Sequence, residues 1–420
     1  MSDRFKTFDF FTTFVFPFKY GDAGSKVDPL DADKLLEGDN TDPARGWKRG
    51  GYSISSDERY NEYKYFHPFV HKAIFSLDGE SAKAGARGME FLTRKDFSGL
   101  SVSTVFEPLD VTTITTNVEH IDLHLYDNNI GLLSITTSLR RDDTETDFRT
   151  LLRYNDIARR VYPPFREDNR PPGGAILPLK VVLSGAATRP VEENFSMMGP
   201  EDISSIIKRL LDPLKYDPSG MSKKGHCFSP YTDDRMFVIS YCYHYAASKN
   251  LTLRGQSSGG FAYEGSDDWY GFLFVDGNGA QIANDGMKAE LIKRHTYARW
   301  RDYGTLFGMS DYSFVLLCGH DPVWTGLLKT HMMTMYYQIS LMVLFQRCML
   351  LKFAHDVDEL TGGMRGVSDD MDVLTKYAKD ANDLKKSFIE FTNKYWFHEV
   401  TPQLQGTEIY RQWVGICDLG

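Results

Sequence analysis

Residues 118–137 restrict the fold of this chain more than any other segment, because they read as two strands joined by a tight turn. In Val118–Tyr126, isoleucine and leucine alternate with polar side chains, which is the period of a strand with one buried face. Asp127-Asn128-Asn129 supplies residues that favour a turn, and Ile130–Thr137 returns as a second strand. We therefore expect a β-hairpin at the centre of a sheet.

The rest of the first three quarters of the sequence alternates between strand-like and helical segments. Aromatic and β-branched runs predict further strands at 10–18, 177–183, 236–245 and 312–317. Helices are predicted at about 144–161, 200–211 and 285–302. Trp269–Val275 and Ala280–Ala283 flank Asp276-Gly277-Asn278-Gly279, which predicts a second hairpin. Residues 22–49 are rich in Gly, Asp and Pro and predict a long loop.

The pattern changes near His320, after which the sequence is helical apart from an expected break at Gly362–Gly363. A second long helix is expected to begin near Ser368. Its apolar side chains recur at steps of three and four, the spacing of a helix-packing seam. They are Met371, Leu374, Ala378, Ala381, Leu384, Phe388, Phe391 and Tyr395.

These segments together predict an α+β protein with an N-terminal mixed α/β sheet domain over residues 1–320. A helical domain with long, stalk-like helices follows over residues 321–420. Because its seam presents more apolar surface than one short domain easily covers, we expect this region to form a homo-oligomer.

Charge and cysteine content narrow the functional classes. The net charge of −9 and the shortness of the basic clusters argue against a nucleic-acid partner. Five cysteines occur without a CxxC pair, and the polar start Met1-Ser2-Asp3-Arg4 is unlike a secretory signal. Free thiols are typical of a reducing compartment, so we expect a cytoplasmic location.

The best candidate for a membrane span is Met332–Ala354. Gln346, Arg347 and Lys352 interrupt its apolar run, and a basic side chain near the bilayer centre costs roughly 3 kcal/mol. A helix buried within the protein is the better interpretation, so no membrane span is expected in this chain.

One motif offers an enzymatic alternative. Gly255-Gln256-Ser257-Ser258-Gly259 matches the GxSxG pattern of hydrolases, with Ser257 as the nucleophile. That chemistry requires a strand before the serine and a helix after it. Gly260–Gly265 is not helical in pattern, so a flexible Gly/Ser loop is favoured over a hydrolase.

Clustered oxygen ligands suggest where a divalent cation would bind. Asp356, Asp358 and Glu359 lie close together near the end of a predicted helix, and Mg²⁺ prefers such carboxylates. A solvated helix end is the alternative. His120 and His124 share one face of a predicted strand, where a polar sheet face is favoured over a metal site.

Several blocks of the sequence, taken together, resemble bacterial CorA-like divalent-cation channel proteins with an enlarged cytosolic domain. They are Tyr65–Val70, Leu123–Leu133, Tyr154–Phe165, Asp233–Phe237, His295–Gly308, Phe345–Arg347 and Phe391–Gly406. The family carries a Gly-Met-Asn signature at its pore entrance. This sequence has Gly308-Met309-Ser310 with no spanning helix before it, so we interpret that match as a coincidence.

The resemblance implies a regulatory, ligand-sensing cytosolic module whose membrane part would continue past Gly420 at the inner face of the membrane. A nucleotide or another small molecule is then the candidate ligand, and Mg²⁺ the candidate ion. The alternatives are a soluble effector or assembly protein, as in antiviral defence, and the hydrolase that would use Ser257. The resemblance names no catalytic residue.

Overall fold

The computed structural model describes most of the chain. The described residues are 8–21, 46–50, 52–75, 89–107, 110–140, 147–162, 178–186, 188–195, 198–199, 202–218, 227–231, 235–254, 260–277, 282–319, 322–364 and 371–419. The predicted loop at 22–49 lies almost entirely outside them.

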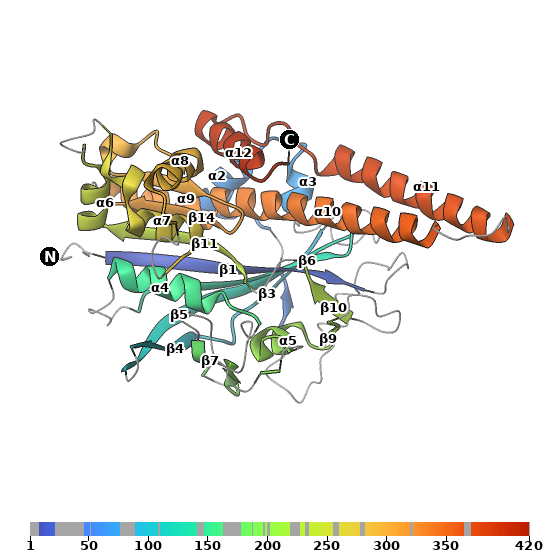
Figure 1. The fold of residues 1–420 in the computed structure, drawn as a ribbon, viewed down its shortest axis with the longest axis horizontal. Helices are drawn as coiled ribbons and strands as arrows, with labels where there is room; N and C mark the ends of the chain where they lie inside the picture. The colour runs from blue at the N-terminus through green and yellow to red at the C-terminus, as the bar shows by residue number, and fades with distance from the viewer. Residues whose placement is uncertain are drawn as a thin grey trace.

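One large mixed sheet organises the fold (Figure 1). Its main path runs β12-β13-β14-β11-β1-β6-β5-β4-β7-β8, and β2, β3, β9 and β10 pair at its sides. The strands are β1 (Phe8–Tyr20), β2 (Lys48–Arg49), β3 (Met89–Arg94), β4 (Gly99–Glu107), β5 (Asp110–Tyr126), β6 (Ile130–Ser138), β7 (Pro178–Ser184), β8 (Val191–Asn194), β9 (Lys215–Tyr216), β10 (Cys227–Pro230), β11 (Phe237–His244), β12 (Thr296–Tyr297), β13 (Leu306–Met309) and β14 (Ser313–Cys318). The expected hairpin at 118–137 is confirmed as β5 and β6, which pair antiparallel at the centre of this sheet.

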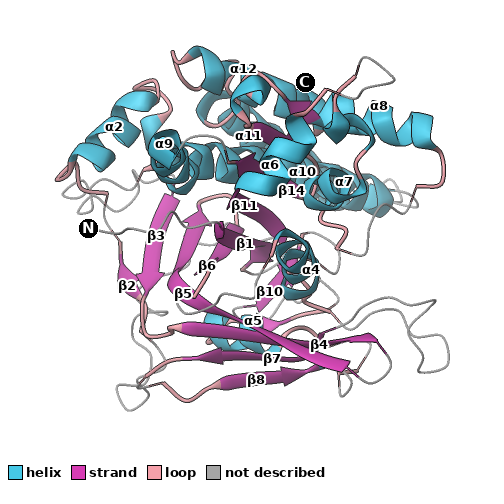
Figure 2. Cartoon of the chain, turned by 90° about the vertical axis from the view of Figure 1, so that its left-hand side faces the viewer, coloured by secondary structure: helices cyan, strands magenta, loops and turns pink. Residues whose placement is uncertain are grey.

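Helices cover both faces of the central strands (Figure 2). They are α2 (Asp57–Tyr65), α3 (His71–Ile74), α4 (Phe148–Ala158), α5 (Ser205–Leu211), α6 (Tyr245–Thr252), α7 (Asp267–Phe274), α8 (Asp285–His295), α9 (Pro322–Met333), α10 (Met335–Met364), α11 (Met371–Lys394) and α12 (Leu404–Ile416). The α+β prediction is confirmed, with the last strand ending at Cys318 and the helical region starting at Pro322.

Alternation along the strands creates two hydrophobic cores. In β1, Phe10 and Phe14 enter the core shared with α4, α5, α7 and α8, whereas Phe11 and Val15 enter the core shared with α3, α10 and α12. Because successive side chains of a strand point to opposite faces, one aromatic strand can serve both cores. The strand β1 thereby contributes aromatic side chains to the cores on both faces of the sheet.

The predicted hairpin at 269–283 is wrong, because residues 267–274 form the helix α7. The Ser266 hydroxyl accepts a hydrogen bond from the backbone N–H of Trp269 at 3.2 Å, which caps the helix start. Trp269 and Phe272, three residues apart, both enter the core. A short apolar run is compatible with strand or helix, and here the cap and the packing decide. Val275, with φ 53°, then ends the helix.

The C-terminal helices divide into a packed part and a projecting part. The first half of α10 is buried between the sheet and α12. Its end runs beside α11, and the pair extends away from the sheet (Figure 1). The break expected at Gly362–Gly363 comes slightly later, since α10 includes both glycines, ends at Met364 and is followed by α11 from Met371. Met371, Leu374 and Phe388 of the predicted seam are exposed.

The first half of α10 also answers the question of a membrane span. Its polar Gln346 is buried and donates hydrogen bonds to the Tyr395 carbonyl at 2.8 Å and to the Tyr410 hydroxyl at 3.0 Å. Arg347 donates to the Asp311 carbonyl at 2.6 Å. Protein groups thus satisfy the polar side chains of this apolar helix. Among the described helices, none has both the length and the apolarity to cross a bilayer.

Candidate ligand-binding site

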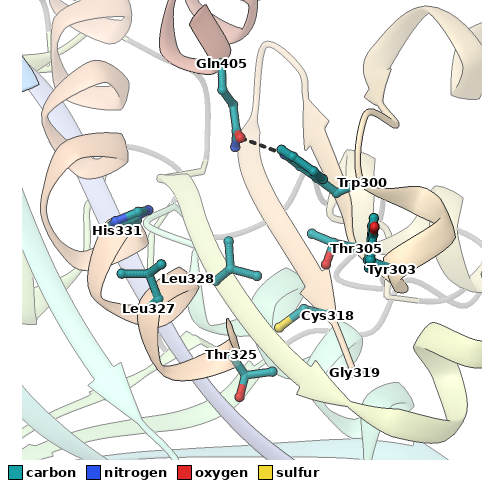
Figure 3. Close-up of a pocket in the computed structure, with 10 residues that line it drawn as sticks. All are labelled: Trp300, Tyr303, Thr305, Cys318, Gly319, Thr325, Leu327, Leu328, His331 and Gln405. Carbon is teal, nitrogen blue, oxygen red and sulfur yellow. Dashed lines mark hydrogen bonds between the residues drawn. The ribbon is translucent and has the colours of Figure 1, made fainter. Parts of the chain in front are cut away.

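A cavity of about 390 Å³ opens where the end of β14 meets α9, α12 and the turn at 298–305 (Figure 3). β14 contributes Cys318 and the following Gly319, and α9 contributes Thr325, Leu327, Leu328 and His331. The turn contributes Trp300, Tyr303 and Thr305, and α12 contributes Gln405. Ligand cavities of α/β proteins commonly lie at the carboxyl ends of strands, as this one does.

Hydrogen bonds hold the aromatic wall of the cavity in place. The indole N–H of Trp300 donates to the side-chain oxygen of Gln405 at 2.7 Å. The amide nitrogen of Gln405 in turn donates to the hydroxyl of Tyr336 in α10 at 2.7 Å. The hydroxyl of Ser248 in α6 donates to the carbonyl of Gly304 at 2.6 Å and so anchors the turn to α6. The Trp300 ring is therefore joined to two C-terminal helices.

Backbone geometry explains why the turn can present its rings. Gly304 has φ 68°, a left-handed conformation that glycine adopts without a Cβ clash. The N–H of Thr305 returns to the carbonyl of Trp300 at 3.1 Å. Trp300 and Tyr303 are thereby left exposed at the cavity rim with their ring centroids 6.1 Å apart.

The described residues that line the cavity carry no formal charge at neutral pH. None of these ten residues is Asp, Glu, Lys or Arg. Burial lowers the pKa of His331, so its imidazole is neutral at pH 7. Burial raises the pKa of Cys318 to about 12, which keeps this residue a thiol. Aromatic rings with a few neutral polar groups suit a planar, largely uncharged molecule.

The predicted carboxylates lie elsewhere, on the exposed end of α10. Asp356 forms an ion pair with Lys352, and Glu359 lies 3.5 Å from His355. Within the described part of the chain, no three His, Cys, Asp or Glu side chains come together in a way that could hold a metal ion. Asp356, Asp358 and Glu359 therefore do not form a cation site within one chain, and their role in Mg²⁺ binding stays a prediction.

The hydrolase motif lacks its structural context. Ser257 lies outside the described residues, but the segments on both sides of it are described. The helix α6 comes before it, and a short 3-10 helix at Ala262–Gly265 comes after it. A nucleophile elbow needs a strand before the serine and an α-helix after it. These flanks argue against the Ser257 alternative.

The polar face of β5 is buried around Asp122 and His124. His124 is 4% exposed and Asp122 is 7% exposed, because α3, α9 and α10 lie over this face. Alternation of polar and apolar residues predicted a polar face, and helices far away in the sequence cover it. Gly308-Met309, which matches part of the pore signature, lies in the strand β13, as expected for a coincidental match.

Sequence reasoning missed every residue of the cavity as a site residue. The available signal was the pair of aromatic residues around Arg301-Asp302 in the segment His295–Gly308, which no buried-strand pattern explains. Gln405 had no signal, since it reaches Trp300 only through the packing of α12. No family model, curated protein or solved structure matches the chain significantly, so the geometry carries the functional argument.

Proposed function

We propose that this chain is a ligand-sensing regulatory module of a CorA-like divalent-cation channel, and that its ligand binds in the cavity beside Trp300. The observation that carries the proposal is the cavity between β14, α9, the 298–305 turn and α12, whose described lining residues are aromatic, aliphatic or neutral polar. Its wall suits a planar ring, so nucleosides and nucleotides are the first class to test. No basic residue is among the described residues of this wall, which favours ligands whose ring provides most of the contact.

The position of Gln405 offers a route from binding to a response. A ring stacked on Trp300 would compete for, or reinforce, the hydrogen bond between Trp300 and Gln405. Gln405 lies at the start of α12 and also contacts Tyr336 of α10. A ligand that favours one arrangement of Trp300 and Gln405 would therefore bias the positions of α12 and α10. Such a bias is what a sensing module needs in order to influence an attached domain.

Binding can be tested by titration calorimetry with adenosine, guanosine and their monophosphates. We expect at least one of them to bind, and Trp300→Ala to weaken that binding tenfold or more because the stacking surface is lost. Tyr60→Ala is the matched control, since Tyr60 is an exposed aromatic on α2 outside the cavity. Failure of all four compounds to bind, or equal affinity in Trp300→Ala, would contradict the proposed ligand class.

Divalent-cation binding is a separate part of the proposal. Since one chain does not gather Asp356, Asp358 and Glu359 around a common point, Mg²⁺ binding there needs carboxylates from a neighbouring copy. We expect millimolar Mg²⁺ to raise the melting temperature of the wild type and not that of the triple Asn/Asn/Gln variant. Equal shifts in differential scanning fluorimetry would exclude these three residues as the site.

A further inference from the structure

A second cavity, of about 350 Å³, lies over the buried face of β5 and is independent of the cavity beside Trp300. Its floor is formed by His120, Asp122 and His124 of β5. Residues of α2, α3, β3, α9 and α10 form its walls. This volume falls at the lower end of the range for small-molecule sites, so its occupant must be small.

Two polar groups on the floor, those of Asp122 and His124, are buried and retain free capacity to accept hydrogen bonds. The Nδ1 atom of His124 is buried and has no hydrogen-bond partner among the described residues. Asp122 accepts from the Thr93 hydroxyl at 2.7 Å and lies 3.4 Å from the Nε2 atom of His120. A carboxylate has about four acceptor positions, so Asp122 can accept further donors. A buried polar atom without a partner costs stability, which indicates a site that a ligand completes.

A buried carboxylate on the wall is already bonded within the protein. Glu62 is 1% exposed, and it accepts from Tyr52 at 2.9 Å, from Arg59 at 3.1 Å and from Gln338 at 3.2 Å. This network attaches α2 to the start of α10 and keeps the wall in place. Burial raises the pKa of Glu62 and its three donors occupy its oxygens, so the open acceptors lie on β5.

The sign of the charge indicates the kind of ligand. Among the described lining residues there are three carboxyl groups, from Glu58, Glu62 and Asp122, and one guanidinium, from Arg59. Aromatic rings complete the wall, and aromatic faces attract cations. These rings belong to Tyr52, Phe75, Phe91 and Tyr337. An anion such as a phosphate would meet like charge here, whereas a protonated amine would meet carboxylates, a free imidazole nitrogen and rings.

We propose that this cavity binds a small organic cation, with an ammonium group that donates hydrogen bonds to Asp122 and to Nδ1 of His124. Burial lowers the pKa of His124 to about 4, so the imidazole is neutral and can accept such a bond at pH 7. The ring of His124 lies 4.8 Å from that of Phe91, which holds it in the cavity wall. A metal ion is the weaker candidate, because no three suitable ligands converge among the described residues.

Titration calorimetry on the full chain with three probes of equal length tests the charge argument. Putrescine is a dication, 1,4-butanediol is neutral and succinate is a dianion. We expect putrescine to bind with a submillimolar dissociation constant, and the other two to bind at least tenfold more weakly. Absence of putrescine binding at 10 mM, preferential binding of succinate or equal binding of butanediol would each overturn the proposal.

Variants of the cavity floor test where the amine binds. Asp122→Asn keeps the shape of the side chain, removes its charge and should weaken putrescine binding tenfold or more. Glu192→Gln is the matched control, because Glu192 is an exposed carboxylate on β8 outside the cavity. Equal affinity in Asp122→Asn and the control would place the amine elsewhere and overturn the proposal.

His124→Phe keeps the proposal testable if Asp122→Asn fails to fold. A phenyl ring preserves the packing against Phe91 and removes the buried nitrogen atom that has no partner. We expect this variant to melt at a higher temperature than the wild type and to bind putrescine at least tenfold more weakly. Stability is expected to rise as binding is lost, because the unpaired atom serves the ligand and not the fold. Undiminished binding of putrescine would overturn the assignment of His124.

Discussion

Replacement of Trp413 should reveal how firmly α12 is held against the sheet. Trp413 is fully buried, and its ring stacks on that of Phe314 with centroids 5.0 Å apart and on that of Phe237 at 5.7 Å. Its indole N–H donates to the carbonyl of Ser310 at 3.2 Å. The side chain thus joins the last described helix to β11, β14 and the loop that precedes β14.

The expected cost follows from these contacts. Truncation of a buried Trp to Ala typically costs about 3–5 kcal/mol, because apolar contacts are lost and a cavity remains. The lost hydrogen bond adds about 1 kcal/mol, since the Ser310 carbonyl stays buried without this donor. Trp413→Phe keeps most of the stacking, so we expect about 1–2 kcal/mol for it. Tyr303→Ala, at a largely exposed aromatic, should cost less than about 0.5 kcal/mol.

Urea denaturation followed by far-UV circular dichroism measures these differences in the free energy of unfolding. Hydrogen exchange of the amides in Leu404–Ile416 shows whether α12 detaches before the rest of the protein unfolds. We expect faster exchange in this helix for Trp413→Ala than for Trp413→Phe. A loss below 1 kcal/mol together with unchanged exchange would show that α12 is not anchored by Trp413, and would remove the proposed route from the cavity to this helix.

Three further outcomes follow from the structure. The folded-state pKa of His124 is about 4, below the ordinary value of 6.5, so protonation favours the unfolded state as the pH falls below 6.5. Between pH 7 and pH 5, urea titrations should therefore show His124→Phe losing about 2 kcal/mol less stability than the wild type. A Cβ at Gly131 would overlap the ring of Phe18 on the paired strand, so Gly131→Ala should lower the urea midpoint by the equivalent of about 1–3 kcal/mol, whereas an unchanged midpoint would contradict this packing. Met371 and Leu374 are exposed on the projecting helix α11, and we expect this surface to mediate self-association. At tens of micromolar protein, light scattering should give a smaller mass for the variant with both residues replaced by Gln than for the wild type, and a monomeric wild type would refute the prediction.

Local sequence determined the elements that carry their own signals. The hairpin of β5 and β6 has alternating side chains on both sides of a turn-forming triplet, so neighbouring residues alone specify it. The strands β1, β11 and β14 are apolar runs flanked by breaks, and their positions were predicted closely. The helical character of the C-terminal region also followed from spacing, because a helix imposes its period on every apolar face it buries.

Ambiguous local signals were decided by packing. Residues 269–275 are apolar enough for a strand, yet the Ser266 cap and the burial of Trp269 and Phe272 make them part of a helix. The helix α10 includes Gly362 and Gly363 and ends at Met364, because a glycine inside a helix costs only about 1 kcal/mol. Short-range patterns cannot weigh such costs against tertiary contacts.

Neither cavity could be predicted, because each is formed by residues that only the folded chain brings together. Trp300 and Gln405 are 105 positions apart and meet when α12 packs beside the 298–305 turn. The sequence predicted a polar face on β5, and the helices that cover Asp122 and His124 turn these residues into a buried site. Alternation in a strand specifies which side chains share a face, whereas the layer that covers that face depends on distant segments, and so does the chemistry that the face can perform.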